Sequence, residues 1–217
     1  ILYFNSGNSG GCRPKCLWHD REGAWLVKFR HTYDPKDIGR MEYKYNEVAR
    51  KCGINVPDYK LLDGKYFASK RFDIENGKRL HIATAGALLN ESISNPKLDY
   101  KVLLHLTGYL TQDSQQVDEM FQRMVFNVLT DNKDDHVKNF SFICREGKWS
   151  LAPAYDLTLC KEGYHGEHAT SANNKGNPDI EDMLAVGESI RIPRRKGMEI
   201  INHMINHCQE ILSTRFE

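Results

Sequence analysis

The residues best suited to chemistry lie in and after one loop, where Asp134 and Asn139 are five positions apart. Asp156 follows a predicted hairpin, whose strands cover residues 140–143 and 149–152. Phosphoryl transfer uses such a set, because one carboxylate deprotonates the acceptor hydroxyl while an amide and a second carboxylate hold Mg²⁺ on the ATP phosphates. Protein kinases carry these groups in the same order. The spacing predicts a kinase, with Asp134 as general base and with Asn139 and Asp156 as metal ligands.

Asp131 and Asp135 lie on the same loop as Asp134, and on composition alone either could serve as the base. Three acidic residues on one loop could also do no more than keep the loop solvated. The separation of five residues from Asn139 favours Asp134, and Asp156 in the expected order makes solvation the weaker explanation. The sequence lacks the phrases His-Arg-Asp and Asp-Phe-Gly that mark most protein kinases.

His136 and Lys138 flank the candidate base on the same loop. Lys138 could contact the transferring phosphoryl group, because a cation there offsets the charge that develops in the transition state. For His136 a hydrogen bond that braces the loop is the preferred interpretation, and a catalytic contact is the alternative. Both residues are therefore candidates for catalysis beside Asp134.

Lys28 belongs to an apolar strand at residues 25–29, which follows a hairpin turn at residues 20–23. An alternating strand often points a lysine to solvent, but a lysine at this spacing after a glycine-rich hairpin can neutralise nucleotide phosphates. Glu42 or Glu47 on the next predicted helix could pair with it. We expect Lys28 to bind the nucleotide.

A glycine-rich stretch near the start of the sequence contains Gly7, Ser9, Gly10 and Gly11. Backbone amides in such a loop can point at phosphate oxygens, since glycine adopts conformations that other residues avoid. A glycine-rich stretch near a terminus is also typical of a flexible tail. These four residues form the candidate phosphate-binding loop.

Hydrophobic periodicity predicts that the chain changes character near residue 73. Before that point, two hairpins (16–19 with 24–29, and 59–62 with 66–69) enclose one helix at residues 40–51. After it, the expected helical segments are 81–89, 99–109, 117–129, 180–189 and 193–214. We therefore expect an α+β, bilobal, protein-kinase-like fold, with a small β-rich N-lobe over residues 1–73 and a mainly helical C-lobe over residues 74–217.

The 217 residues carry 30 Lys and Arg against 29 Asp and Glu, a balance that argues against a nucleic-acid-binding surface. No run approaches eighteen apolar residues, which argues against a membrane span, and the N-terminus lacks the pattern of a secretory signal. The six cysteines show neither a Cys-x-x-Cys pair nor zinc-site spacing, so we expect free thiols in a reducing cytosol and a cytoplasmic protein. The sequence has no initiator Met, and we expect further residues upstream.

Several phrases of the sequence resemble those of one known family, the HipA family of bacterial toxin kinases. They are residues 134–142 at the loop, 149–157 around Asp156, 7–15 at the glycines, 25–29 around Lys28, and 70–73. The resemblance implies a Ser/Thr protein kinase of a toxin–antitoxin system that uses ATP and Mg²⁺. It also implies aminoacyl-tRNA synthetases as the substrate class, inhibition of translation as the outcome, and a small DNA-binding helix-turn-helix antitoxin as partner.

The resemblance also assigns roles to residues that the spacing leaves open. Lys70 and Phe72 would belong to the hinge whose backbone binds adenine. Lys70 stands where relatives commonly have Glu, a change that adenine recognition by main-chain atoms would tolerate. Of the two possible partners of Lys28, the resemblance favours Glu42 over Glu47.

The sequence departs from the family at two further points. A Ser in the glycine-rich loop of HipA-like kinases is autophosphorylated and switches the kinase off, but Asn8 stands at that position, with Ser9 adjacent and Ser6 nearby. Relatives also carry an N-terminal subdomain before this loop. Some toxins of this kind encode that segment as a separate small protein, which is a further candidate partner.

Two other functions fit the same residues. A small-molecule kinase of the phosphoinositide-kinase-like or aminoglycoside type shares the order of the two Asp residues and the Asn. A catalytically silent module could keep the fold while serving in binding or regulation. Silent relatives of kinases usually lack a metal ligand or the lysine, whereas Lys28, Asp134, Asn139 and Asp156 are all present. The favoured hypothesis is an active protein kinase.

Overall fold

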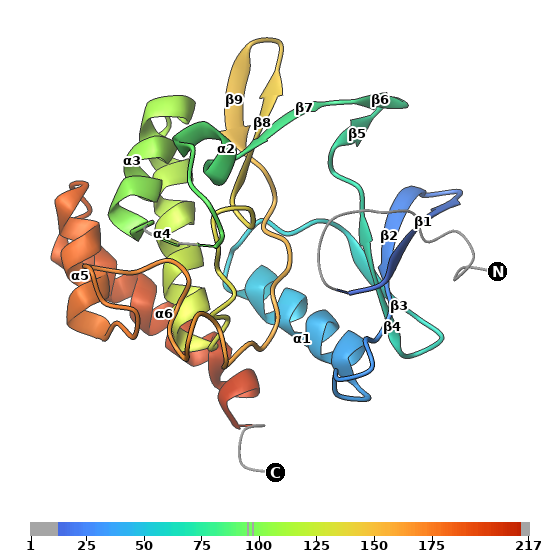
Figure 1. Ribbon diagram of the computed structural model, residues 1–217. Helices are drawn as coiled ribbons and strands as arrows, with labels where there is room; N and C mark the ends of the chain where they lie inside the picture. The colour runs from blue at the N-terminus through green and yellow to red at the C-terminus, as the bar shows by residue number, and fades with distance from the viewer. Residues whose placement is uncertain (1–12, 95, 97, 214–217) are drawn as a thin grey trace.

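The computed structural model describes residues 13–94, 96 and 98–213, and its elements separate into a sheet-rich and a helix-rich part (Figure 1). The larger sheet has the strand order β1-β2-β4-β3, with all neighbours antiparallel. Its strands are β1 (Lys15–Asp20), β2 (Gly23–Lys28), β3 (Tyr59–Leu62) and β4 (Tyr66–Lys70). Val27 on β2 lies opposite Ala68 on β4, and both are fully buried. Both predicted hairpins are present, and pairing of β2 with β4, which the sequence did not predict, joins them into one sheet. Strand β2, which ends at Lys28, is therefore held from both sides.

Helix α1 (Ile38–Lys51) lies between this sheet and the helix-rich part (Figure 1). Tyr45, Val48 and Ala49 are buried at helical spacing, which explains why the segment folds as a helix. The helix ends at Cys52, and Gly53 follows with φ of +84°, a left-handed conformation that glycine adopts readily. The Tyr45 hydroxyl donates to the carbonyl of Thr130 (2.7 Å), so α1 is tied to the loop region of the helix-rich part.

Four helices build most of the helix-rich part: α3 (Tyr100–Thr111), α4 (Ser114–Leu129), α5 (Ile180–Ser189) and α6 (Arg194–Ser213). Aspartate side chains cap the first turns of α3, α4 and α5 by accepting backbone N–H groups. Helix α4 is central, because Met120, Phe121, Met124 and Val125 are all inaccessible to solvent. These residues fall within the helix predicted over residues 117–129, and their burial in the core fixes the position of the loop after α4.

A second sheet has three strands, β7 (His81–Thr84), β8 (Ser141–Arg145) and β9 (Lys148–Leu151), of which β8 and β9 follow the same loop. The predicted helix over residues 81–89 is wrong in its first half, since β7 pairs antiparallel with β8 and only α2 (Ala85–Leu89) is helical. Pairing with β8 satisfies the backbone of this short segment and overrides its weak local preference. A two-stranded hairpin, β5 (Ile74–Glu75) and β6 (Lys78–Arg79), precedes it.

Two hydrophobic clusters stabilise the described part of the chain. The smaller one lies in the four-stranded sheet and contains Cys16, Trp25, Val27 and Ala68. The larger one runs continuously from α1 through α3, α4 and α5 to α6. Within it, Cys52 at the end of α1 and Cys208 of α6 are buried with their Sγ atoms 3.9 Å apart. Helix α1 therefore shares its core with the helices that follow it in sequence.

In the ranges that the structure describes, no helix has both the length and the apolar character needed to cross a membrane.

Candidate active site

The amine of Lys28, at the end of β2, meets two carboxylates from other parts of the chain. Its Nζ atom is paired with Glu42 of α1 and lies 2.5 Å from Oδ1 of Asp156, a residue 128 positions later. The side chains of Lys28 and Glu42 are buried, while that of Asp156 keeps 42% of its surface exposed. The partner of Lys28 on α1 is thus Glu42, and Glu47 is not paired with it.

The charges of Lys28, Glu42 and Asp156, which together form a triad, depend on one another. Burial by itself would lower the pKa of Lys28, but the carboxylates of Asp156 and Glu42 outweigh burial and raise the pKa above its ordinary value. Burial would raise the pKa of Asp156, yet the neighbouring ammonium of Lys28 lowers that pKa overall. At neutral pH the site therefore presents a fixed cation beside a fixed anion.

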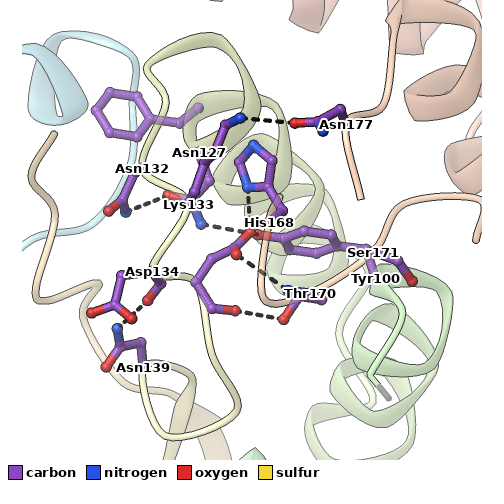
Figure 2. Close-up of polar contacts among 12 residues, drawn as sticks. Tyr100, Asn127, Asn132, Lys133, Asp134, Asn139, His168, Thr170, Ser171 and Asn177 are labelled. Carbon is purple, nitrogen blue, oxygen red and sulfur yellow. Dashed lines mark hydrogen bonds and ion pairs between the residues drawn. The ribbon is translucent and has the colours of Figure 1, made fainter. Parts of the chain in front are cut away.

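The loop between α4 and β8 holds Asp134 and Asn139 in a defined relation. Nδ2 of Asn139 donates to the main-chain carbonyl of Asp134 at 2.7 Å (Figure 2). The carboxylate of Asp134 is 58% exposed and accessible to a substrate. Partial burial raises the pKa of Asp134, and the charge of Asp156 adds to this, although His136 opposes it. A carboxylate with a raised pKa is a stronger base, which suits proton abstraction from a hydroxyl.

Asn139 and Asp156 offer the oxygen ligands that Mg²⁺ prefers. Because the amide nitrogen of Asn139 is hydrogen-bonded to the carbonyl of Asp134, the Oδ1 atom of Asn139 is available to a cation. Asp156 has φ of +57°, an uncommon conformation outside glycine that functional sites often retain. Over the described ranges, no three His, Cys, Asp or Glu side chains gather into a metal-binding group. Oxygen donors of this kind suit a magnesium ion that would complete its shell with phosphate oxygens, as in kinase sites.

His136 and Lys138 occupy different positions around the candidate base. Nε2 of His136 lies 3.8 Å from Oδ1 of Asp134, too far for a hydrogen bond, and its buried Nδ1 atom has no hydrogen-bond partner among the residues described. The imidazole therefore stands beside the carboxylate without bracing the loop through Nδ1. The side chain of Lys138 is exposed, and its carbonyl accepts a hydrogen bond from Tyr155 at 2.6 Å.

Lys70 and Phe72, the candidate hinge residues, lie where β4 leaves the sheet. The N–H groups of Lys70 and Arg71 both donate to main-chain carbonyls at 2.8 Å, which fixes the path of the backbone. The ring of Phe72 stacks on Tyr155, with centroids 5.6 Å apart. Burial raises the pKa of Tyr155 to about 12, so its hydroxyl stays a donor at neutral pH. The stack thus connects the candidate hinge to the residue that precedes Asp156.

A cavity of about 210 Å³ opens on the α1 side of Lys28. Besides Lys28 and Glu42, its wall contains four cationic residues, which are Arg13, Arg30, Lys36 and Lys65. This excess of positive charge would draw an anion toward Lys28. Lys70 and Phe72 do not line the cavity, so the structure does not join the candidate hinge to it.

The candidate phosphate-binding loop, Gly7, Ser9, Gly10 and Gly11, lies outside the described residues, as do Ser6 and Asn8. The described chain begins beside the site, because the N–H of Phe29 donates to the carbonyl of Pro14 at 2.8 Å. Arg13 is held there by an ion pair with Asp34 at 3.0 Å.

Asp135, the rival base next to Asp134, is fully buried and cannot reach a substrate hydroxyl. Its Oδ2 atom accepts a hydrogen bond from Tyr100 (2.6 Å) and lies 2.9 Å from Nδ1 of His168, while Thr170 N–H donates to Oδ1 (3.2 Å). In Figure 2 the labelled side chains of Tyr100 and His168 lie close together beside the loop that carries Asp134. The sequence analysis did not identify Tyr100, His168 and Thr170 as partners of Asp135. The sequence pointed to them only through the presence of a second aspartate beside the candidate base.

Comparisons with known proteins agree with this geometry. The model of the HipA-like C-terminal domain matches residues 7–212. Y4dM of Sinorhizobium fredii, which its name assigns provisionally to the kinases, is 27% identical over 169 residues, covering 70% of this chain and 41% of the relative. HipA of Shewanella oneidensis MR-1, solved with HipB and operator DNA, superimposes with a TM-score of 0.78 at 20% identity, covering 96% of this chain and 58% of HipA.

The proinflammatory kinase CtkA of Helicobacter pylori has a TM-score of 0.57 at 14% identity, and the alignment covers 93% of each chain. These structural matches confirm the predicted α+β, protein-kinase-like fold. The chain spans about two fifths of the length of Y4dM and under three fifths of the length of the Shewanella HipA. The family match extends over nearly the whole sequence, and the chain therefore belongs to the HipA-like kinase family, of which it contains the C-terminal domain.

Proposed function

We propose that this chain is an ATP- and Mg²⁺-dependent Ser/Thr protein kinase and the toxin of a toxin–antitoxin system. The observation that carries the proposal is the amine of Lys28, which joins Glu42 of α1 to Asp156. In protein kinases a strand lysine paired with a helix glutamate, next to a metal-binding aspartate, must be in place for phosphoryl transfer. A silent module has no need to keep a buried lysine between two carboxylates.

Each residue has a defined part in the proposed reaction. Asp134 accepts the proton of a Ser or Thr hydroxyl while that oxygen forms a bond to the γ-phosphorus of ATP. The bond from the γ-phosphorus to the bridging oxygen breaks, and ADP leaves with the electron pair. Lys28 binds phosphate oxygens, and Asn139 and Asp156 hold Mg²⁺, which supplies charge neutralisation when bound. Lys138, whose side chain is exposed, can approach the transferring group.

The proposed partners follow from the family. The Shewanella HipA was solved with HipB and operator DNA, and we expect a corresponding small helix-turn-helix antitoxin for this chain. The proposed substrate is a translation-related protein such as an aminoacyl-tRNA synthetase. Some toxins of this kind encode the N-terminal subdomain as a separate small protein, and such a protein is a further proposed partner.

The test is incubation of the purified chain with radiolabelled ATP and Mg²⁺, alone and with bacterial lysate, followed by phosphoamino-acid analysis. We expect labelled phosphoserine or phosphothreonine in protein from the wild type and from Glu47→Gln, an acid on α1 outside the triad. Asp134→Asn should give no label. If a metabolite rather than protein is labelled, the chain is a small-molecule kinase. If neither is labelled while ATP binds, the silent-module hypothesis replaces the proposal.

A further inference from the structure

Two adjacent residues of the catalytic loop have opposite surroundings. The carboxylate of Asp134 is largely exposed, whereas that of Asp135 is fully buried. The two residues share one peptide unit, so the direction of the first side chain depends on how the second is held. A buried carboxylate is stable only when charge or hydrogen bonds replace its water, and here those partners come from outside the loop.

One arm of the network around Asp135 reaches into the helices. The hydroxyl of Tyr100, at the start of α3, donates to Asp135 and accepts from Nδ2 of Asn127 on α4 at 3.0 Å. Oδ1 of Asn127 then accepts from Nδ2 of Asn132 at 2.9 Å, as Figure 2 shows. All four side chains are buried. The loop is thereby fastened at both Asn132 and Asp135 to the core around α3 and α4.

The other arm reaches residues 160–177, the segment that follows the candidate metal ligand Asp156. His168 and Thr170 both bind the carboxylate of Asp135, and the Thr170 hydroxyl donates to the Asp135 carbonyl at 2.5 Å. The backbone of Lys133 is bonded to that of Ala169, and the Lys133 amine donates to Oδ1 of Asn177 at 2.8 Å (Figure 2). Hydrogen bonds therefore connect the catalytic loop to residues 160–177 at several points.

We propose that Asp135 and His168 are positioning residues, which lock the catalytic loop to residues 160–177 and so fix the aim of Asp134. The proposal rests on the kinase function proposed above. The carboxylate suits the role because its three contacts are an O–H, an N–H and an imidazole nitrogen. An amide at residue 135 would turn its NH₂ group toward either the Tyr100 O–H or the Thr170 N–H, both of which donate to the carboxylate.

The contacting atom of the imidazole gives a sharp rescue experiment. Nδ1 of His168 makes the contact, and the amide nitrogen of Asn can occupy nearly the same place, whereas that of Gln lies one carbon farther out. We expect His168→Asn to retain most activity, and His168→Gln and His168→Ala to lose it. Asp135→Asn should lower kcat by about 10- to 100-fold, the range that a misplacement near 1 Å produces. The KM for ATP should change less than threefold, because Lys28 and Phe72 lie on other segments.

Asp182 provides the matched control. It is also buried, and it accepts hydrogen bonds from Asn173 (3.0 Å) and from the N–H of Asp179 (3.0 Å) and pairs with Lys175 (2.9 Å). It therefore anchors the far end of residues 160–177 to the start of α5, and none of these contacts involves the catalytic loop. Asp182→Asn should lower the stability of the fold without lowering kcat more than twofold. Amide hydrogen exchange of the unliganded variants supplies a second readout, since Asp135→Asn should accelerate exchange in residues 131–139 and 168–171.

Two results would overturn the positioning role. One is a kcat for Asp135→Asn within twofold of the wild type. The other is an equal loss of kcat in Asp135→Asn and Asp182→Asn at equal loss of stability. If the wild type transfers no phosphate, the proposed function fails. Hydrogen exchange alone then decides whether Asp135 locks the loop to residues 160–177. Accelerated exchange confined to the loop and residues 168–171 supports the lock, and unchanged exchange refutes it.

Discussion

Replacing Glu42 by Gln tests whether the buried pair with Lys28 organises the site. The change keeps the shape and an acceptor oxygen but removes the negative charge that faces the Lys28 amine. Glu42 is only 2% exposed, so water cannot take its place. Glu47→Gln on the same helix is the matched control, because Glu47 is not paired with Lys28.

The expected loss of stability follows from the contacts. Breaking a buried ion pair completely costs about 3–5 kcal/mol, but Lys28 keeps Asp156 as a second carboxylate. The loss should therefore be nearer the value of a hydrogen bond to a charged group, about 1.5–3 kcal/mol. For a chain of this size that corresponds to a fall in Tm of about 3–12 °C. Glu47→Gln should change the free energy of unfolding by less than about 0.5 kcal/mol.

Urea unfolding, followed by tryptophan fluorescence, measures both variants under the same conditions. The raised pKa of Lys28 fixes the pH range. A lysine whose pKa is higher in the folded state stabilises fully below its unfolded pKa of about 10.4, and this contribution is lost only as pH rises through the folded value. The difference between Glu42→Gln and wild type should therefore stay constant from pH 6 to 9. It should also persist at high salt, since a buried pair is weakly screened.

The same variant should lower phosphotransfer by at least about tenfold, because a loss of 1.4 kcal/mol in transition-state stabilisation has that effect. The reasoning is refuted if Glu42→Gln unfolds like Glu47→Gln and keeps its activity. Such a result would mean that Asp156 alone holds Lys28 in place and that α1 does not control the site.

Three further changes test other parts of the site. Asp134→Asn should abolish phosphotransfer. The variant should unfold at a higher urea concentration than wild type at pH 7 and at the same concentration at pH 3, because the raised pKa of Asp134 makes its ionisation unfavourable to folding only above the unfolded pKa. Urea curves that coincide with those of wild type at both pH values would contradict this. Phe72→Ala should raise the KM for ATP several-fold and cost about 0.5–1.5 kcal/mol from the lost stack on Tyr155, and an unchanged KM in steady-state assays would remove Phe72 from the nucleotide site. Gly39→Ala should lower the free energy of unfolding by about 1–3 kcal/mol, because the added Cβ would overlap the carbonyl of Lys65; thermal unfolding that matches wild type would contradict the close approach of the β3–β4 turn to α1.

The elements that carry strong patterns could be predicted from the sequence. Alternation and turn residues predicted both hairpins of the larger sheet, and hydrophobic periodicity predicted a helix over residues 117–129, which lies within α4. The strand β7 could not be predicted, because its structure depends on pairing with β8, whose sequence lies about 60 positions later. Local preference contains no information about such a partner.

Only part of the candidate site could be predicted from the sequence. Spacing selected Asp134, Asn139 and Asp156, since kinase chemistry fixes their order. Whether Asp134 or Asp135 faces the solvent could not be predicted, because burial of Asp135 is set by Tyr100, His168 and Thr170, each at least 33 positions away. The pairing of Lys28 with Glu42 rather than Glu47 likewise followed from family resemblance and not from helical spacing.

The core shared by α1 and α6 has a consequence for the nascent chain. Every described candidate for chemistry lies before residue 160, so ribosomes complete these residues while α6 is still unmade. Yet α1, which presents Glu42, packs against α6, with Cys52 beside Cys208. During translation the face of α1 that packs against α6 therefore stays uncovered until α6 emerges from the exit tunnel. The helix that presents Glu42 would thus gain its full packing only after the residues of the candidate site have been synthesised.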